Sequence, residues 1–418
     1  MDLKTHNDCR AVIAAPAGNL EKLRIAAAYG ADEIYFGGAD FNLRSQAGNF
    51  SEDDILKGLS FCGERGIATT FLLNSFLHEN DIDAARRYIN EIRRFPFDAL
   101  MISDPGMLEL IRESGIETPI HLSTQMSTLN HLAVKFWQRL GIQRIVLGRE
   151  ISLGEIQGIR DHTDAEIEVF AHGSLCISYS GRCLLSRYLT GRDANLGSCT
   201  HPCRWRYALV EEKRPGSHFE VIEHARGTEI LSSKDLRLIE KVPAYIEAGV
   251  NAFKIEGRMK SLYYTANTTR IYKHAVRTRG DAYARFLPFW EKELDLVSHR
   301  PYTDNLFNEF NGSEFSGIPY IKKALFIGYS VSQGRDATGA YIRVFNPLRE
   351  NDVIDAIYPI DGETVRDSTL TVKSISDDGT GVQMAQPGKI YHVEFDKAID
   401  TNAILRRQIP YTTGERQC

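Results

Sequence analysis

The chain has 418 residues, of which 43% are hydrophobic and 25% are charged, and its formal net charge is −5. This composition is typical of a globular protein that buries an ordinary core. No run approaches the roughly 18 apolar residues that a membrane-spanning helix needs, and the N-terminus "MDLKTHNDCR" lacks the apolar stretch of a secretory signal. We therefore expect a cytoplasmic location, no membrane partner and no disulfide framework.

Eight short apolar or β-branched runs precede residue 260, and helix signals separate most of them. In the segment "NLEKLRIAAAYG", for example, Asn19 is a candidate N-cap and Gly30 a candidate stop. The alternation predicts an α/β fold, a TIM-like (β/α)8 barrel, with a doubly wound sheet as the alternative. The predicted strands are residues 11–15, 33–38, 67–74, 99–104, 119–125, 144–150, 166–173 and 252–258.

The regular spacing is broken once, between the seventh and the eighth predicted strand. Residues 173–250 form an insertion there, and it contains four of the seven cysteines. Loops that follow the strands of such a barrel form the face where active sites lie. The insertion is therefore expected to lie over the mouth of the barrel.

A second domain follows the barrel. Residues 1–300 are assigned to the barrel and 301–323, rich in Asn, Gly and Ser, to a linker. In residues 324–418, short β-branched runs such as "GAYIRVFNP" and "IYHVEF" alternate with Gly, Asp and Asn turns. This pattern predicts a small C-terminal antiparallel β-barrel.

The clustered cysteines are Cys176, Cys183, Cys199 and Cys203. Soft sulfur ligands select zinc, copper(I) or iron-sulfur clusters, and these spacings can converge on one centre. Only the last two cysteines form the short knuckle usual in zinc sites, so zinc is an alternative metal. The alternative without a metal is that the four thiols are buried and pack as small hydrophobic groups.

The segment "EVFAHGSLCISYSGRCLLS" resembles the signature of the collagenase-like peptidase family of unknown catalytic type, peptidase family U. The resemblance continues through "APAGNLEKL", "ADEIYFGG", "SCTHPCRW", "SSKDLR" and "FKIEGRMKS", and so covers the whole barrel. The matching signature positions are Glu168, Phe170, Gly173, Ser174, Leu175, Cys176, Gly181, Cys183, Leu185 and Ser186.

Several members of this family are oxygen-independent hydroxylation proteins with a 4Fe-4S cluster. The resemblance implies that the four clustered cysteines are the cluster ligands and that the substrate is the wobble uridine of tRNA, converted to 5-hydroxyuridine with prephenate as hydroxyl source. Hydroxylation of ribosomal RNA or of the ubiquinone ring, and peptide hydrolysis, are the alternatives. Arg237 stands in "SSKDLR", where some quinone-hydroxylating relatives have a ligand, and this favours the RNA branch. The sequence identifies neither an electron donor nor an oligomeric state.

The charge pattern also favours an RNA partner. Residues 254–279 contain seven Lys or Arg and one Glu, in a chain whose net charge is negative. On a helix, Arg270, Lys273 and Arg277 would share one face with Tyr263 and Tyr264. Such a face suits phosphates and stacked bases, although a solvated basic helix has the same pattern.

Candidate residues for the chemistry follow the predicted strands. A guanidinium binds a carboxylate in a bidentate manner, so Arg44, Arg149 and Arg258, with Lys254 nearby, are candidates to hold a dicarboxylate such as prephenate. His172, Glu150 and Glu256 end predicted strands and are candidate acid–base groups. Each of these three is also compatible with a purely structural role.

Overall fold

The structure is a computed structural model that describes residues 11–43, 49–176, 178–204, 234–304, 320–334 and 336–409, with four short strands between residues 209 and 229. Two compact units are present. The first contains residues up to Ala27, Ala31–Lys260 and Arg300–Pro319. The second contains Ala28–Gly30, Ser261–His299 and Tyr320–Cys418.

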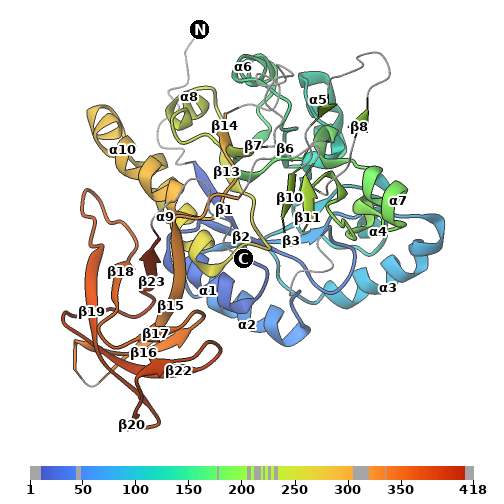
Figure 1. Ribbon diagram of the computed structural model, residues 1–418. Coiled ribbons are helices and arrows are strands. Elements are labelled where there is room, and N and C mark those ends of the chain that lie inside the picture. The colour runs from blue at the N-terminus through green and yellow to red at the C-terminus, as the bar shows by residue number, and fades with distance from the viewer. Residues whose placement is uncertain are drawn as a thin grey trace. The chain divides into compact units, whose positions relative to one another are not determined.

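The first unit is a closed barrel of eight parallel strands surrounded by helices (Figure 1). The last strand, β13, pairs with both β1 and β7, as Ala252 aligns with Val12 on one side and with Glu168 on the other. The predicted TIM-like barrel and all eight predicted strands are confirmed. The strands are β1 Val12–Pro16, β2 Glu33–Phe36, β3 Ala68–Leu73, β4 Ala99–Ile102, β5 Ile120–Leu122, β6 Arg144–Val146, β7 Glu166–Ser174 and β13 Ala252–Ile255.

The strands form because their residues are buried on both faces, as in β2 and β4, where every residue is buried. The helices between them carry their own start signals. Ser51 caps α2 with a reciprocal capping box to Asp54, and Asn130 caps α5 through the amide of Ala133. The helices of this unit are α1 Leu20–Ala28, α2 Glu52–Gly63, α3 Ile82–Ile92, α4 Pro105–Glu113, α5 His131–Arg139, α6 Leu153–Arg160, α7 Leu185–Thr190 and α8 Val242–Glu247.

The insertion between β7 and β13 begins at the C-terminal end of β7. It contains the short helix α7, three 3₁₀ turns and the short strands β8 Leu209–Val210, β9 His218–Phe219, β10 Ile222–His224 and β11 Gly227–Glu229. The last three residues of the "SSKDLR" motif form β12 Asp235–Arg237. This strand runs antiparallel to β7 and parallel to β14 Tyr302–Thr303. The sequence reading did not anticipate β12.

The second unit contains a six-stranded antiparallel barrel, closed by the pairing of β18 with β19. This confirms the predicted fold of the C-terminal region. Its barrel strands are β15 Ala324–Gln333, β16 Gly339–Val344, β18 Val353–Ile357, β19 Ser368–Asp377, β22 Ile390–Phe395 and β23 Ile404–Gln408, with β17 Leu348–Arg349, β20 Thr380–Gly381 and β21 Met384–Ala385 as short additions.

Two long helices, α9 Leu262–Arg277 and α10 Asp281–Leu296, belong to the second compact unit. The two compact units therefore divide the chain near residue 260, whereas the predicted domain boundaries at residues 300 and 323 stay a prediction. None of the described helices combines the length and apolar character that crossing a membrane requires.

Candidate active site at the barrel mouth

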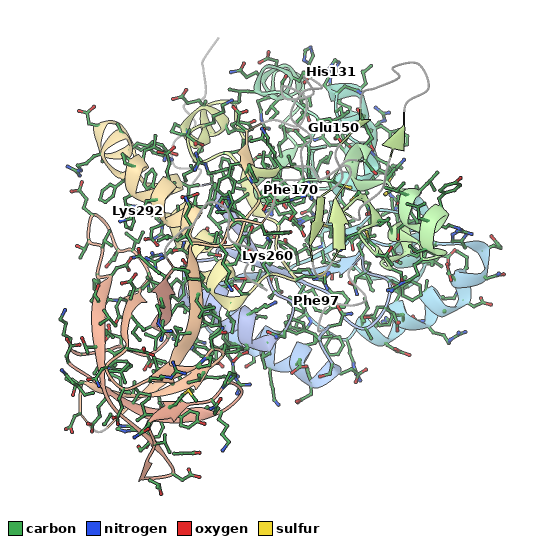
Figure 2. The ribbon with its side chains drawn as sticks, in the orientation of Figure 1. Phe97, His131, Glu150, Phe170, Lys260 and Lys292 are labelled. Atoms are coloured by element: carbon green, nitrogen blue, oxygen red, sulfur yellow. The ribbon has the colours of Figure 1, made fainter. Side chains whose placement is uncertain are left out.

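A pocket of about 150 Å³ lies where the strands of the first unit end at their carboxyl edge. Phe170 of β7 lies centrally among the strands in Figure 2 and forms part of the pocket wall. The insertion closes one side, because Ser180, Gly181 and all four clustered cysteines also line the pocket. The prediction that the insertion lies over the barrel mouth is thus confirmed by the lining residues.

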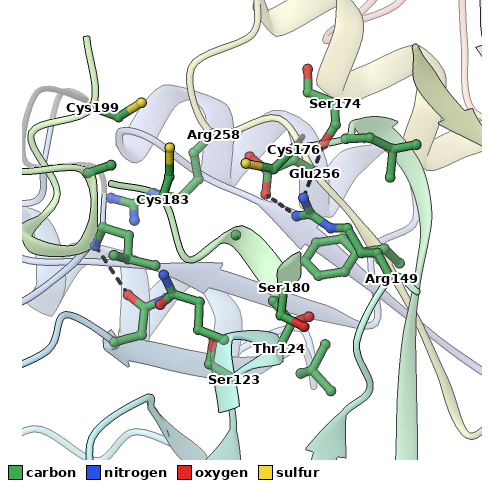
Figure 3. A pocket seen from close by; sticks show the side chains of 18 of the residues that line it. Ser123, Thr124, Arg149, Ser174, Cys176, Ser180, Cys183, Cys199, Glu256 and Arg258 are labelled. Atoms are coloured by element: carbon green, nitrogen blue, oxygen red, sulfur yellow. Dashed lines mark hydrogen bonds and ion pairs between the residues drawn. The ribbon is translucent and has the colours of Figure 1, made fainter. Parts of the chain in front are cut away.

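Short local interactions fix the loops that carry the cysteines. The amide of Cys183 donates to the side-chain oxygen of Asn195 at 3.2 Å, and the side-chain nitrogen of Asn195 donates to the carbonyl of Cys183 at 3.1 Å. The amide of His201 donates to Cys199 Sγ at 3.4 Å. Figure 3 shows the sulfurs of Cys176, Cys183 and Cys199 directed into the same part of the pocket. Four soft donors around one space fit a sulfur-ligated metal centre.

Arg149 is held against the pocket wall. Its guanidinium carbon lies 4.0 Å from the centroid of the Phe170 ring, and Nη1 donates to the carbonyl of Ser174 at 3.4 Å. Glu256 Oε2 lies 4.0 Å from Nη2, at the limit of an ion pair (Figure 3). Since Arg149 and Glu256 both line the pocket, the structure brings together two residues that the sequence reading proposed.

Arg258 approaches the pocket from the segment after β13. Its Nη1 and Nη2 donate to the side-chain oxygens of Asn42 at 3.1 Å and Asn49 at 2.9 Å. Gly37 permits this approach, because a Cβ there would lie 2.9 Å from Asn42 Cγ and 3.2 Å from Arg258 Nη2. Gly37 therefore leaves the space that the Arg258 guanidinium and Asn42 occupy. The third arginine proposed for substrate binding, Arg44, lies outside the described residues.

Lys254 forms part of the pocket floor and reaches into the barrel. Its Nζ lies 2.7 Å from Glu168 and 4.1 Å from the centroid of the Tyr35 ring. Burial opposes ionisation of Glu168, but the charges of Lys254 and Arg144 outweigh it and lower the pKa of this carboxyl. Glu168 is therefore ionised, and its carboxylate holds the Lys254 ammonium group at the pocket floor through a buried ion pair.

The ion pairs continue down the barrel axis. Arg144 contacts Glu33, Glu168 at 3.4 Å and Glu166 at 2.8 Å, and Thr70 donates to Glu33 at 2.6 Å. We call Glu33, Arg144, Glu168 and Lys254 the barrel cluster. The sequence reading noted Lys254 but missed the cluster, although charged residues within apolar parallel strands are a visible signal.

His121 lies beside the two carboxylates of the barrel cluster, and the ligand atoms of Glu33, His121 and Glu168 lie within 4.8 Å of one another. This is a possible cation site by spacing. However, Arg144 and Lys254 already neutralise both carboxylates. A divalent cation would leave a large uncompensated positive charge in the barrel interior, so the three residues are better explained as a structural cluster.

Two predicted acid–base residues are not among the residues that line the pocket. Glu150 accepts hydrogen bonds from the amide of Ser180 at 2.5 Å and from its hydroxyl at 3.0 Å, where Ser180 has a φ of 49°. Its carboxylate therefore stabilises a strained turn that lines the pocket, and its predicted catalytic role stays a prediction. His172 is buried, with its ring 5.3 Å from that of Tyr302, and does not reach the pocket. Glu256, which does line the pocket, stays a candidate.

The predicted RNA-binding face on α9 is wrong in its central residues. Arg270 is fully buried, and its guanidinium donates to Glu293 and Asp367, each at 2.7 Å. Tyr263 and Tyr264 are also buried, so neither ring can stack on a base. Arg277 is exposed and Lys273 is half-buried, and their RNA contacts stay a prediction.

The structure belongs to the class of (β/α)8-barrel proteins and carries a cysteine-rich insertion at the mouth of the barrel. Comparison with known proteins identifies the family. The chain matches the model of Peptidase family U32 over residues 18–316 and belongs to that family, as the sequence motifs indicated. It is 34% identical to the tRNA hydroxylation protein P1 of Bacillus subtilis (strain 168) over 405 residues, which cover 94% of each chain.

Two further relatives have names that refer to RNA. The tRNA hydroxylation protein P of Escherichia coli (strain K12) is 35% identical over 370 residues, 78% of this chain and 79% of the relative. The 23S rRNA 5-hydroxycytidine C2501 synthase of the same organism is 33% identical over 363 residues, 83% of this chain and 52% of the relative.

Proposed function

We propose that this chain is an RNA hydroxylase that converts the wobble uridine of tRNA to 5-hydroxyuridine, with prephenate as the hydroxyl source. The observation that carries the proposal is the convergence of four cysteines and three cationic side chains, Arg149, Lys254 and Arg258, on one pocket. Similarity to the Bacillus subtilis tRNA hydroxylation protein along nearly the whole of both chains supports the choice of substrate.

In this proposal Cys176, Cys183, Cys199 and Cys203 hold a 4Fe-4S cluster. Their soft sulfur donors and their common position around one pocket support this assignment. The cluster would supply electron-transfer chemistry. Hydrogen bonds between Asn195 and the backbone of Cys183, and from the amide of His201 to Cys199 Sγ, position two of these four cysteines.

The cationic side chains would bind the dicarboxylate. Arg149 is fixed by Phe170 and Ser174, and Arg258 by two asparagine oxygens, so each guanidinium is oriented in advance. Lys254, paired with Glu168, places a third basic side chain at the pocket floor. Glu256 is the carboxylate at the pocket that could accept or donate a proton during the reaction.

The metal assignment is tested on protein purified without oxygen. We expect a brown protein with broad absorbance at about 400 nm and about four irons per chain. Cysteine-to-alanine substitution at any of the four positions should remove iron and tRNA modification together. A colourless protein that binds one zinc would contradict the cluster.

Cys62 supplies the matched control. Burial raises the pKa of its thiol to about 11, so it is protonated and inert, and it lies on α2 away from the pocket lining. Cys62→Ala should keep full iron content. Loss of iron on this substitution would show that iron content reports general unfolding and not ligation.

The substrate assignment is tested in cells that lack the gene. We expect 5-hydroxyuridine and its derivatives to disappear from bulk tRNA and to return when the gene is restored. Unchanged tRNA nucleosides with an altered ribosomal RNA or quinone profile would redirect the proposal to those substrates. Unchanged profiles in all three would refute hydroxylation as the function.

A further inference from the structure

We propose that the outer face of α7 and its flanking residues is the surface on which a single-stranded RNA loop docks. The surface consists of Arg182, Leu184, Arg187, Tyr188 and Arg192, and we call it the α7 surface. The inference rests on the proposed function and adds to it the place where the RNA backbone and the base next to the target are held.

The apolar part of the α7 surface is unusually open to solvent. Leu184 is 73% exposed and Tyr188 is 85% exposed. They stand four residues apart on the helix and its N-cap, so they lie on the same face. An exposed ring beside an exposed aliphatic side chain is costly in water, and such patches mark interaction sites.

The positive charge of residues 178–203, which include α7, favours a negatively charged partner. Residues 178–203 contain three arginines and one aspartate, whereas the whole chain has a net charge of −5. Arg187 lies 3.0 Å from Asp193, but the pair is exposed on the arginine side and contributes little. A phosphate can therefore displace Asp193 as the partner of Arg187.

Arginines around an exposed ring are typical of surfaces that bind single-stranded nucleic acid, where the cations contact phosphates and the ring stacks on a base. A membrane is a poorer match, since α7 has six residues and cannot present the long apolar face of an interfacial helix. A single-stranded loop, as in an anticodon, offers both the phosphates and the unstacked bases.

The α7 surface is joined directly to the pocket. Leu184 follows Cys183, and the preceding turn, Ser180 and Gly181, lines the pocket. The inner face of α7 packs on the segment that carries Cys199, because the fully buried Ser186 accepts a hydrogen bond from the amide of Thr200 at 3.1 Å. RNA bound here would therefore lie next to the cysteines.

The dimensions also match. Leu184 and Tyr188 are separated by about 6 Å along the helix axis, at 1.5 Å per residue. Stacked nucleotides are spaced by roughly 3.4 Å along a strand. The surface between these two side chains thus accommodates about two nucleotides beside a base that has been turned into the pocket, as enzymes that modify a base require.

The test measures binding of a fluorescein-labelled anticodon stem-loop RNA by fluorescence anisotropy. Tyr188→Ala should weaken binding by about 5- to 150-fold, the usual loss for one stacked base, and Tyr188→Phe should bind like the wild type. Arg187→Glu with Arg192→Glu should also weaken binding and lower the dependence of affinity on salt by about one unit of slope for each phosphate contact.

A second exposed apolar site on the barrel provides the control. On α5, Phe136 is 48% exposed and Arg139 lies 6.0 Å from its ring. Phe136→Ala with Arg139→Glu makes the same kinds of change and should leave RNA affinity unaltered. All variants alter exposed side chains, so iron content and circular dichroism should match the wild type.

The outcomes separate this inference from the proposed function. If the wild type binds the stem-loop and restores 5-hydroxyuridine in cells, but the α7 variants do so equally well, the docking surface is overturned and the proposed function stands. If the wild type neither binds the stem-loop nor changes tRNA nucleosides, the proposed function is overturned together with RNA as the occupant of this surface.

Discussion

Each compact unit contains a buried cluster of ion pairs, and the cluster in the first unit reaches the pocket at the barrel mouth. The barrel cluster has two carboxylates and two cations, and its Lys254 lines the pocket. The second unit has a matching group that we call the sealed cluster, formed by Arg270, Glu293, Asp367 and Arg406.

In the sealed cluster the arginines are surrounded by acceptors. Arg270 donates to Asn267 at 2.8 Å, to the carbonyl of Tyr358 at 2.9 Å and to both acidic members of the cluster. Arg406 forms two hydrogen bonds to Glu293, at 2.6 and 2.8 Å. A buried arginine with such a full set of partners has a structural role, whereas a buried cation at the edge of a pocket can also bind an anion.

The largest expected effect is on the sealed cluster. Glu293→Gln keeps the shape of the side chain but removes the charge shared by two buried arginines. We expect the free energy of unfolding of the second unit to fall by about 3–5 kcal/mol, the usual cost of leaving buried charges uncompensated. Hydrogen–deuterium exchange of the α9 and α10 amides would measure it, because it reports on this unit separately.

Glu363→Gln is the matched control in the same unit. Glu363 pairs with Arg285 on the surface, with both side chains more than half exposed, and its loss should be nearly neutral. A similar loss of protection in both variants would show that the sealed cluster contributes no more than a surface ion pair.

The corresponding change in the barrel cluster should cost less stability and more activity. Glu168→Gln removes the partner of Lys254, but water or an anion in the pocket can replace it. We expect a loss of about 1.5–3 kcal/mol, the range for one charge-assisted hydrogen bond. Modification should fall about tenfold or more, because Lys254 would lose the carboxylate that fixes its Nζ at the pocket.

The measurements are hydrogen–deuterium exchange of β7 and β13 and the yield of modified tRNA. A loss of stability in Glu168→Gln equal to that in Glu293→Gln, with modification intact, would show that the barrel cluster is as closed as the sealed one. The contrast between the two units would then fail.

The sequence predicted the barrel because each strand is a local apolar run, and it grouped the four cysteines that line the pocket because they lie within 28 positions of one another. It failed for α9. The spacing of Arg270, Lys273 and Arg277 predicts one basic face, but the partners that bury Arg270 are Glu293, on the next helix, and Asp367, almost a hundred residues away. No local pattern carries that information. The same limit applies to Arg144 and Glu33, which are more than a hundred residues apart in the chain.

A smaller effect is expected from pH, and it should be visible in the second unit. Trp290 Nε1 donates to His274 Nδ1 at 2.9 Å, so the ring proton is on Nε2, which lies 2.7 Å from the carbonyl of Gly362. Burial lowers the pKa of His274 below its ordinary value of 6.5, in spite of the opposing effect of this carbonyl and of Glu363. The neutral ring is therefore the form that the fold stabilises.

The stability due to His274 should be complete above pH 6.5 and decline as the pH falls from there to the lower pKa of the folded state, because only the unfolded chain takes up the proton. A separate loss of stability should begin below about pH 4.5. There the unfolded chain takes up a proton on Glu293, whereas the lowered pKa keeps this carboxylate ionised in the folded state. Exchange of the α10 amides between pH 8 and 4, corrected for intrinsic rates, would resolve the two steps. His274→Gln can keep both hydrogen bonds without titrating, so only the first step should vanish.

The smallest effect concerns Tyr263, which the sequence pattern offered as a base-stacking residue. Its hydroxyl accepts a hydrogen bond from Arg406 Nη1 at 2.9 Å, and burial raises its pKa to about 12, so it stays neutral. Tyr263→Phe removes one of several partners of Arg406 and should cost about 1 kcal/mol in the exchange of α9. The affinity for the anticodon stem-loop should not change, whereas Tyr188→Ala on the α7 surface should weaken it. If Tyr263→Phe weakened RNA binding as much as Tyr188→Ala, the sealed cluster would have to open when RNA binds. Both clusters would then be accessible to a ligand, and the contrast between the two units would not hold.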